Sequence, residues 1–192
     1  MDNASGVRQL LQAGFDPNTP DERGQPPLVL AARESSDKVF AALLADPRTR
    51  VDAANAHGET ALMMAALRGR LDQVQALVAR GAVLPGQGAA GARAWTPLHY
   101  AVSADVDDHG AQWLLQRGAN ANAVAPNGNT PLMLAAAYGR ESAVRLLVAA
   151  GAQRQLRNDR GLSASDFARN AGREALAQWL AASPTGAASA PR

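Results

Sequence analysis

The side chains that could support acid–base chemistry or bind a metal are few and widely spaced. The histidines are His57, His99 and His109, and no two of them stand four residues apart, the spacing that places two ligands on one helix face. The chain contains no cysteine, which excludes thiolate zinc sites and disulfide scaffolds. The sequence therefore predicts no metal site.

A second set of residues has the types needed for nucleophilic catalysis or calcium binding. Ser103, His99 and Asp105 match a nucleophile, a base and an orienting acid, but no strand–turn–helix pattern presents the serine. Asp105, Asp107 and Asp108 form an acidic cluster that lacks the central glycine and closing glutamate of a calcium loop. We therefore predict no catalytic residue and expect a solvent-exposed turn at this cluster.

The segment from Gly86 to Gly91 spells G-x-G-x-x-G, the glycine pattern of dinucleotide-binding sites. That function requires a preceding strand and a helix that begins inside the motif, so that the pyrophosphate meets the helix N-terminus. Here the preceding pattern is helical, and the next helix is expected only at Thr96. We expect an insertion loop at 85–93 and no cofactor; a small-ligand site at this loop is the weaker alternative.

Charge and hydropathy exclude further classes of protein. The 192 residues contain 19 basic and 17 acidic side chains, a net charge of +2 that is too even for an electrostatic footprint on nucleic acid. No apolar run approaches the ~20 residues of a membrane-spanning helix. No signal peptide is recognisable, so we expect a cytoplasmic location, or a periplasmic one if an upstream signal has been removed.

The elements that must position these side chains recur along the chain. In the clearest unit, Gly128 supplies a turn after Asn127, Thr130 is suited to cap a helix, and Pro131 suits its first position. Gly151 is expected to end a second helix. The corresponding turns fall at positions 24, 58, 94, 128 and 161, so the steps are 34, 36, 34 and 33 residues. This is the signature of a repeat protein.

The stretch 96–101 reads TPLHYA, and the repeat closely resembles the ankyrin repeat, whose signature is T-P-L-H-x-A and whose period is 33. The resemblance implies an all-α solenoid of helix-turn-helix units joined by β-hairpin turns. We expect residues 2–182 to form one ankyrin-repeat domain of the bacterial type, a half repeat and about five repeats, with a disordered tail at 183–192. Val7, Leu10 and Leu11 match an outer helix without its inner helix, so we expect the natural polypeptide to begin upstream.

The resemblance also implies a function, which is to bind a partner protein through the hairpin tips and the concave face of the inner helices. The residues expected at these positions are Trp95, Tyr138, Arg68, His57, Glu59, Arg93, Asn127, Asn129 and Arg33. Trp95 and Tyr138 are the strongest candidates, because large aromatic side chains at exposed positions indicate contact surfaces. The alternatives are that Trp95 shields the Gly-rich loop and that Tyr138 packs on Ala104.

We accordingly expect a non-enzymatic, monomeric module whose partner protein the sequence does not identify. Most of its arginines are expected to be ordinary solvated surface, and a minority could form a patch for an acidic partner. The alternative is a fragment of a larger exported or enzymatic protein whose activity lies outside this chain.

Overall fold

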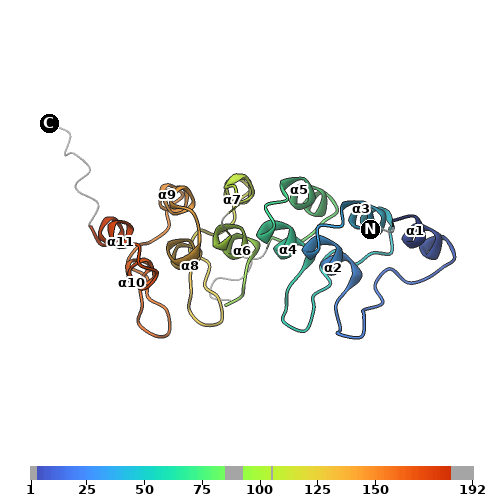
Figure 1. The fold of residues 1–192 in the computed structure, drawn as a ribbon, viewed down its shortest axis with the longest axis horizontal. Coiled ribbons are helices and arrows are strands. Elements are labelled where there is room, and N and C mark those ends of the chain that lie inside the picture. Colours follow the sequence, from blue (N-terminus) through green and yellow to red (C-terminus); the bar gives the residue numbers. More distant parts are fainter. Residues whose placement is uncertain (1–3, 85–92, 105, 183–192) are drawn as a thin grey trace.

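The structure is a computed structural model that describes residues 4–84, 93–104 and 106–182. These residues form eleven helices in two rows, inner and outer, with hairpins projecting below the inner row (Figure 1). The inner helices are α2 (Pro27–Arg33), α4 (Ala61–Leu67), α6 (Pro97–Ser103), α8 (Pro131–Tyr138) and α10 (Ala164–Asn170). The outer helices are α1 (Ala4–Gln12), α3 (Asp37–Ala45), α5 (Leu71–Ala79), α7 (His109–Gln116), α9 (Glu141–Ala149) and α11 (Glu174–Ala181). The predicted all-α ankyrin solenoid is confirmed.

The helix ends follow from local sequence. The hydroxyl of Thr130 accepts a hydrogen bond from the backbone N–H of Met133 at 3.4 Å, and Pro131 occupies the first turn of α8, as predicted. Gly151 adopts φ +88° just beyond α9, and the N–H of Ala152 reaches back to the Leu147 carbonyl at 2.9 Å. These caps fix where each repeat turns.

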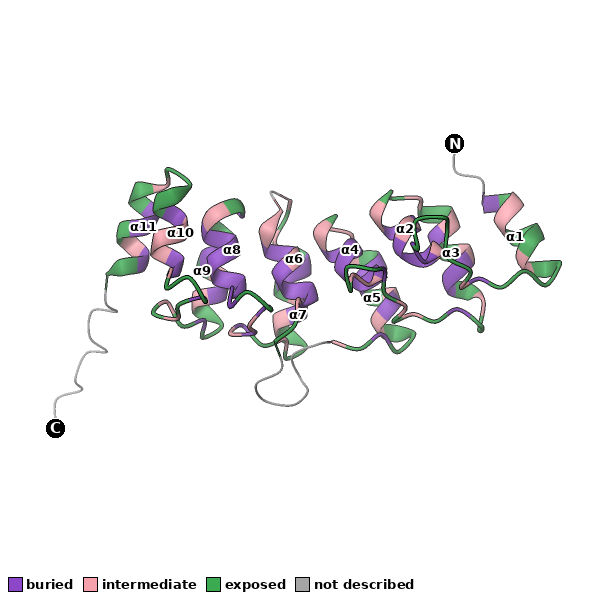
Figure 2. Cartoon of the chain, turned by 90° about the horizontal axis from the view of Figure 1, so that it is seen from below, coloured by how far each residue is buried: buried purple, intermediate pink, exposed green. Residues whose placement is uncertain are grey.

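The core is a continuous line of leucines and alanines between the two rows. Leu62, Leu98 and Leu132 occupy equivalent positions of successive inner helices and are almost fully buried. Each inner helix packs on the next one along the row, and also on its own outer helix. Figure 2 shows burial concentrated on the inner helices α2, α4, α6 and α8. The core is therefore continuous along the array, and each repeat contributes one layer to it.

The hairpins are tight turns with little β pairing. The N–H of Ala125 donates to the carbonyl of Asn129 at 2.9 Å, and isolated bridges occur only at two other hairpins of the described residues. Gly128 has φ +79°, whereas Asn127 is not left-handed, so only the glycine needs the predicted conformation. A Cβ at Gly128 would also meet the backbone N of Asp159 at 2.6 Å. The tip of one hairpin thus lies directly against the next.

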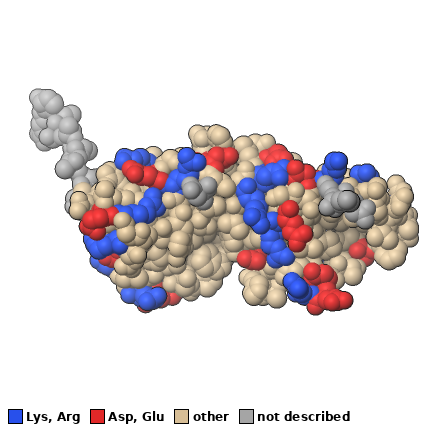
Figure 3. All heavy atoms as spheres, in the orientation of Figure 1, with Lys and Arg blue, Asp and Glu red and all other residues tan. Residues whose placement is uncertain are grey.

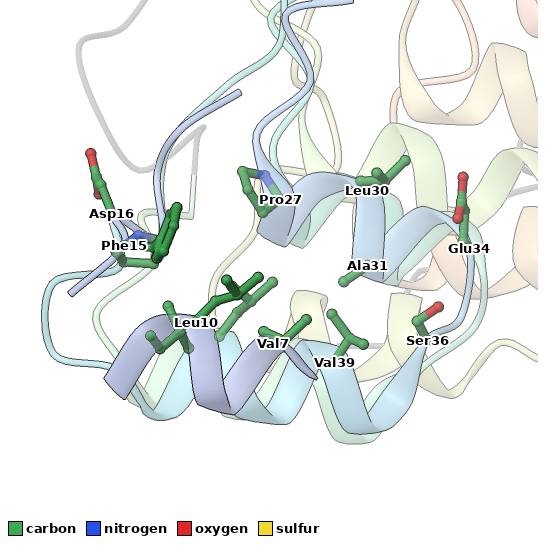
Figure 4. Close-up of a pocket in the computed structure, with 13 residues that line it drawn as sticks. Val7, Leu10, Phe15, Asp16, Pro27, Leu30, Ala31, Glu34, Ser36 and Val39 are labelled. Atoms are coloured by element: carbon green, nitrogen blue, oxygen red, sulfur yellow. The ribbon is translucent and has the colours of Figure 1, made fainter. Parts of the chain in front are cut away.

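The two ends of the array differ. At the C-terminal end the Arg173 guanidinium donates to three carbonyls near the end of α8, at 2.8 to 3.0 Å. At the other end α1 packs on α3, and no inner helix precedes α1 in the described residues. An apolar groove of about 320 Å³ remains there between α1 and α2 (Figure 4). Leu10 and Phe15 line it and are 50% and 62% exposed.

Candidate functional site

A hollow of about 330 Å³ lies on the concave face between α6 and α8. Its lining residues are Trp95, His99, Tyr100, Ser103, Leu134 and Tyr138. Tyr138 is 66% exposed at the end of α8, and Trp95 is half-buried just before α6. The structure therefore brings the two aromatic residues singled out from the sequence to one hollow.

The Trp95 ring is held by its neighbours in this hollow. It meets the His99 ring edge-on, with centroids 5.4 Å apart and planes at 78°. It meets the Tyr100 ring in a similar arrangement at 6.3 Å and 69°. Edge-to-face aromatic pairs stabilise by more than their buried area alone. One side of the indole is thus part of the framework, while the other remains available in the hollow.

His99 has a structural role. Its Nε2 donates to the carbonyl of Asn129 at 3.2 Å, and its Nδ1 accepts from the Thr96 backbone N–H at 3.2 Å and hydroxyl at 2.8 Å. Burial lowers the pKa of His99 to about 4, so the ring is neutral at pH 7. The Ser103 hydroxyl donates to the Tyr100 carbonyl at 3.0 Å, with no hydrogen bond to His99. The arrangement is a framework for two adjacent repeats.

A chain of hydrogen bonds continues from the hollow along the groove floor. The Tyr100 hydroxyl donates to the Glu59 carboxylate at 3.2 Å, and Asn55 donates to the same carboxylate at 2.8 Å. Asn55 also reaches Gln25 at 3.1 Å, which accepts from Arg33 at 3.3 Å. Burial, followed by the charge of Glu59, raises the pKa of Tyr100 to about 12. Five side chains from three repeats thus form one polar line.

Tyr100 is a site residue that the sequence analysis missed. It directly follows the signature histidine in TPLHYA and stands five residues after Trp95. This second aromatic residue, so close to a tryptophan expected at the contact surface, could have identified Tyr100 from the sequence.

A column of basic side chains stands near the middle of the face shown in Figure 3, with acidic side chains directly against it. Arg68 is exposed, and its Nε donates to the carbonyl of Arg33 at 2.8 Å. Neither arginine forms an ion pair with a carboxylate of the described residues. Arg70, by contrast, lies 2.6 Å from Asp37 and 3.3 Å from Asp72.

The hairpin-tip candidates are dispersed. His57 is exposed, as expected for a tip. Arg93 pairs with Asp159, 66 residues away, at 2.7 Å. Asn127 accepts the N–H of Asn129 at 3.1 Å. Asn129 itself is buried, and its side-chain oxygen accepts from the next repeat at 2.8 Å. We therefore correct its placement from the contact surface to the framework between repeats.

In residues 4–84, 93–104 and 106–182 no cluster of histidine and carboxylate side chains could hold a metal ion. In the described part of the acidic turn, Asp107 accepts the N–H of His109, the first residue of α7, at 2.9 Å. Within the same described ranges, no helix combines the length and the hydropathy of a membrane span. The Gly-rich motif at 86–91 and the tail at 183–192 lie outside the described residues.

Comparison with known proteins agrees with this geometry. A family model described as ankyrin repeats (3 copies) matches residues 2–87 and 98–188. The chain is 32% identical over 157 residues to the nuclear factor NF-kappa-B p105 subunit of Gallus gallus, covering 81% of the chain and 16% of that protein. It is 35% identical over 156 residues to the B-cell lymphoma 3 protein homolog of Mus musculus, covering 79% of the chain and 34% of that protein.

A shorter match joins the chain to neurogenic locus notch homolog protein 4 of Homo sapiens, at 40% identity over 75 residues, 39% of this chain and 4% of that protein. The chain thus spans about a third or less of the length of these relatives. All three come from animals, so the expected bacterial type is not supported. Ankyrin repeats are protein–protein interaction modules. With most of its length matched by the family model, the chain belongs to the ankyrin-repeat family.

Proposed function

We propose that this chain is a non-enzymatic interaction module that holds a segment of a partner protein on its concave face. The hollow formed by Trp95, Tyr100 and Tyr138 is the anchor point. The single observation that carries this proposal is the exposure of Tyr138, 66%, beside two aromatic rings in one hollow. Tyr and Trp dominate interface energies when a partner removes them from water.

The rigid surroundings of Tyr138 support this role. Tyr138 directly precedes Gly139, where an added Cβ would collide with the carbonyl oxygen of Val102 on α6. The end of α8 therefore lies tightly against α6, and the position of the tyrosine is set by backbone contact. A pre-positioned aromatic side chain loses less entropy when it binds than a mobile one does.

The N-terminal groove is the competing surface (Figure 4). It is also apolar and holds Leu10 and Phe15, but it continues the row of inner helices beyond α2. Repeat stacking alone accounts for an apolar face at that position, because every other inner helix in the row packs on a preceding one. The concave hollow has no such explanation, which favours it as the binding site.

The test compares two exposed aromatic residues at the two surfaces. A partner is first isolated from the source cells by affinity pull-down, and its Kd is measured for wild type, Tyr138→Ala and Phe15→Ala. We expect Tyr138→Ala to weaken binding about tenfold or more, with an unchanged urea midpoint. Phe15→Ala should bind like wild type. Wild-type affinity in Tyr138→Ala would refute the concave site.

A further inference from the structure

We infer that the partner segment carries an acidic side chain that pairs with Arg68, about five or six residues from the apolar side chain that fills the hollow. This inference rests on the proposed function and specifies the chemistry of the partner. Its starting point is the way in which the Arg68 guanidinium is held.

Arg68 has an oriented guanidinium whose outer edge is unused by the fold. Its Nε donates to the Arg33 carbonyl at 2.8 Å, which restrains the plane of the group. Its two Nη atoms form no hydrogen bond with any residue in the described part of the chain. Two parallel Nη–H donors match the two oxygens of a carboxylate. Because Arg68 is exposed, a partner can reach that edge.

Two other arginines show how the fold engages a guanidinium group fully. Arg70, two residues further on, pairs with both Asp37 and Asp72. Arg173 uses Nη1 on three carbonyls near the end of α8. Arg68 makes one hydrogen bond of this framework type and keeps its charge uncompensated by any described ion pair.

Two arginines place positive charge at this point. Arg33 contributes a second positive charge from α2, and its guanidinium donates to the neutral Gln25 side chain at 3.3 Å. Glu34, the residue after Arg33, lines the groove on the α1 side of α2 (Figure 4). The Glu59 carboxylate accepts hydrogen bonds at the groove floor. Figure 3 shows a basic column near the middle of one face, with acidic side chains directly against one side of it and an uncharged area on the other.

The repeat geometry sets the spacing within the partner. Arg68 follows α4, and the hollow lies between α6 and α8. The Arg68 guanidinium contacts the Arg33 carbonyl at the end of α2, so it lies between α2 and α4. Packed helices lie about 8–10 Å apart, so the two intervals from there to the hollow correspond to about 16–20 Å. An extended segment rises about 3.3 Å per residue and covers this distance in about five or six residues. The inference is therefore an extended segment with an acidic residue and an apolar anchor about five or six positions apart.

The test uses a random twelve-residue peptide library displayed on phage and the full chain immobilised as bait. Wild type, Arg68→Glu, Arg68→Gln and Tyr138→Ala are compared, with Arg8→Glu on α1 as a control of equal charge change. Circular dichroism verifies that each variant is folded. Wild type should enrich an aromatic or leucine residue with Asp or Glu about five or six positions away. Arg68→Glu should keep the apolar residue and select Lys or Arg at the other position.

The Kd values of individual enriched peptides then measure how much each substitution weakens binding. Arg68→Gln should weaken an enriched peptide about three- to tenfold, the range of a partly exposed charge pair, whereas Arg8→Glu should not change its Kd. If wild type enriches the apolar residue alone and Arg68→Glu selects the same peptides, this inference is wrong and the proposed function survives. If the enriched peptides bind Tyr138→Ala as well as wild type, both are wrong.

Discussion

The Trp95 ring meets the buried His99 ring edge-on at 5.4 Å, so one of the two aromatic residues proposed for binding also belongs to the framework of the groove. Tyr138 lies across the same hollow and is mostly exposed. The two residues should therefore respond differently to truncation.

Trp95→Ala removes both a contact surface and two aromatic pairs. We expect it to lower the free energy of unfolding by about 1–3 kcal/mol as well as to weaken partner binding. Tyr138→Ala should change stability by less than about 0.5 kcal/mol. Urea unfolding of the two variants measures this difference, and equal losses of stability would contradict the structural part assigned to Trp95.

The buried His99 should make stability depend on pH. Its pKa is about 4 in the folded state and 6.5 ordinarily, so only the unfolded chain takes up a proton between these values. The free energy of unfolding should therefore fall as the pH falls from 6.5 towards 4, by about 3 kcal/mol in all. Urea titrations at pH 7, 5.5 and 4.5 measure this slope.

Carboxylates change the free energy of unfolding at a lower pH than His99 does, so the two contributions can be separated. Hydrogen bonds from Arg48 lower the pKa of Asp46 to about 2, so its contribution is present above pH 3.8 and is lost as the pH falls towards 2. Equal unfolding free energies at pH 7 and pH 4.5 would contradict the burial of a neutral His99.

The repeat core predicts a contrast between two leucines. Leu132 is 1% exposed between neighbouring repeats, whereas Leu10 on α1 is 50% exposed. Leu132→Ala should cost about 2–5 kcal/mol and Leu10→Ala less than about 1 kcal/mol. Similar urea midpoints for the two variants would mean that the inner row is not the core.

Gly139 and Gly110 give a matched pair of glycines with negative φ. A Cβ at Gly139 would collide with the Val102 carbonyl oxygen, while a Cβ at Gly110 in α7 meets nothing within 4 Å. Gly110→Ala should stabilise by up to about 1 kcal/mol through helix propensity. Gly139→Ala should destabilise the folded state, because the Val102 backbone cannot shift without disturbing α6. Thermal melts of both variants decide, and stabilisation by Gly139→Ala would refute the tight contact of α6 with α8.

The features predictable from sequence were those set within one repeat. Thr130 and Pro131 start a helix and Gly151 ends one because capping depends on nearest neighbours in the chain. Trp95 and Tyr138 could be chosen because their repeat positions face the groove.

The features that the sequence did not reveal depend on side chains of different repeats. Tyr100 and Glu59 are 41 residues apart, and Arg93 and Asp159 are 66 apart, so no local pattern relates them. Asn129 stands at a position expected to be exposed, but the next repeat covers it through a hydrogen bond. Side-chain direction across the repeat interface decided each case.

The most direct test of the concave binding site is photo-cross-linking from a single position. A benzophenone amino acid replaces Tyr138 in one variant and Phe15 in another, and each is irradiated with the isolated partner. Because the reactive group captures only atoms in contact with it, we expect a covalent adduct from position 138 and none from position 15. Cross-linking from position 15 with none from position 138 would contradict the central claim and move the binding site to the N-terminal groove.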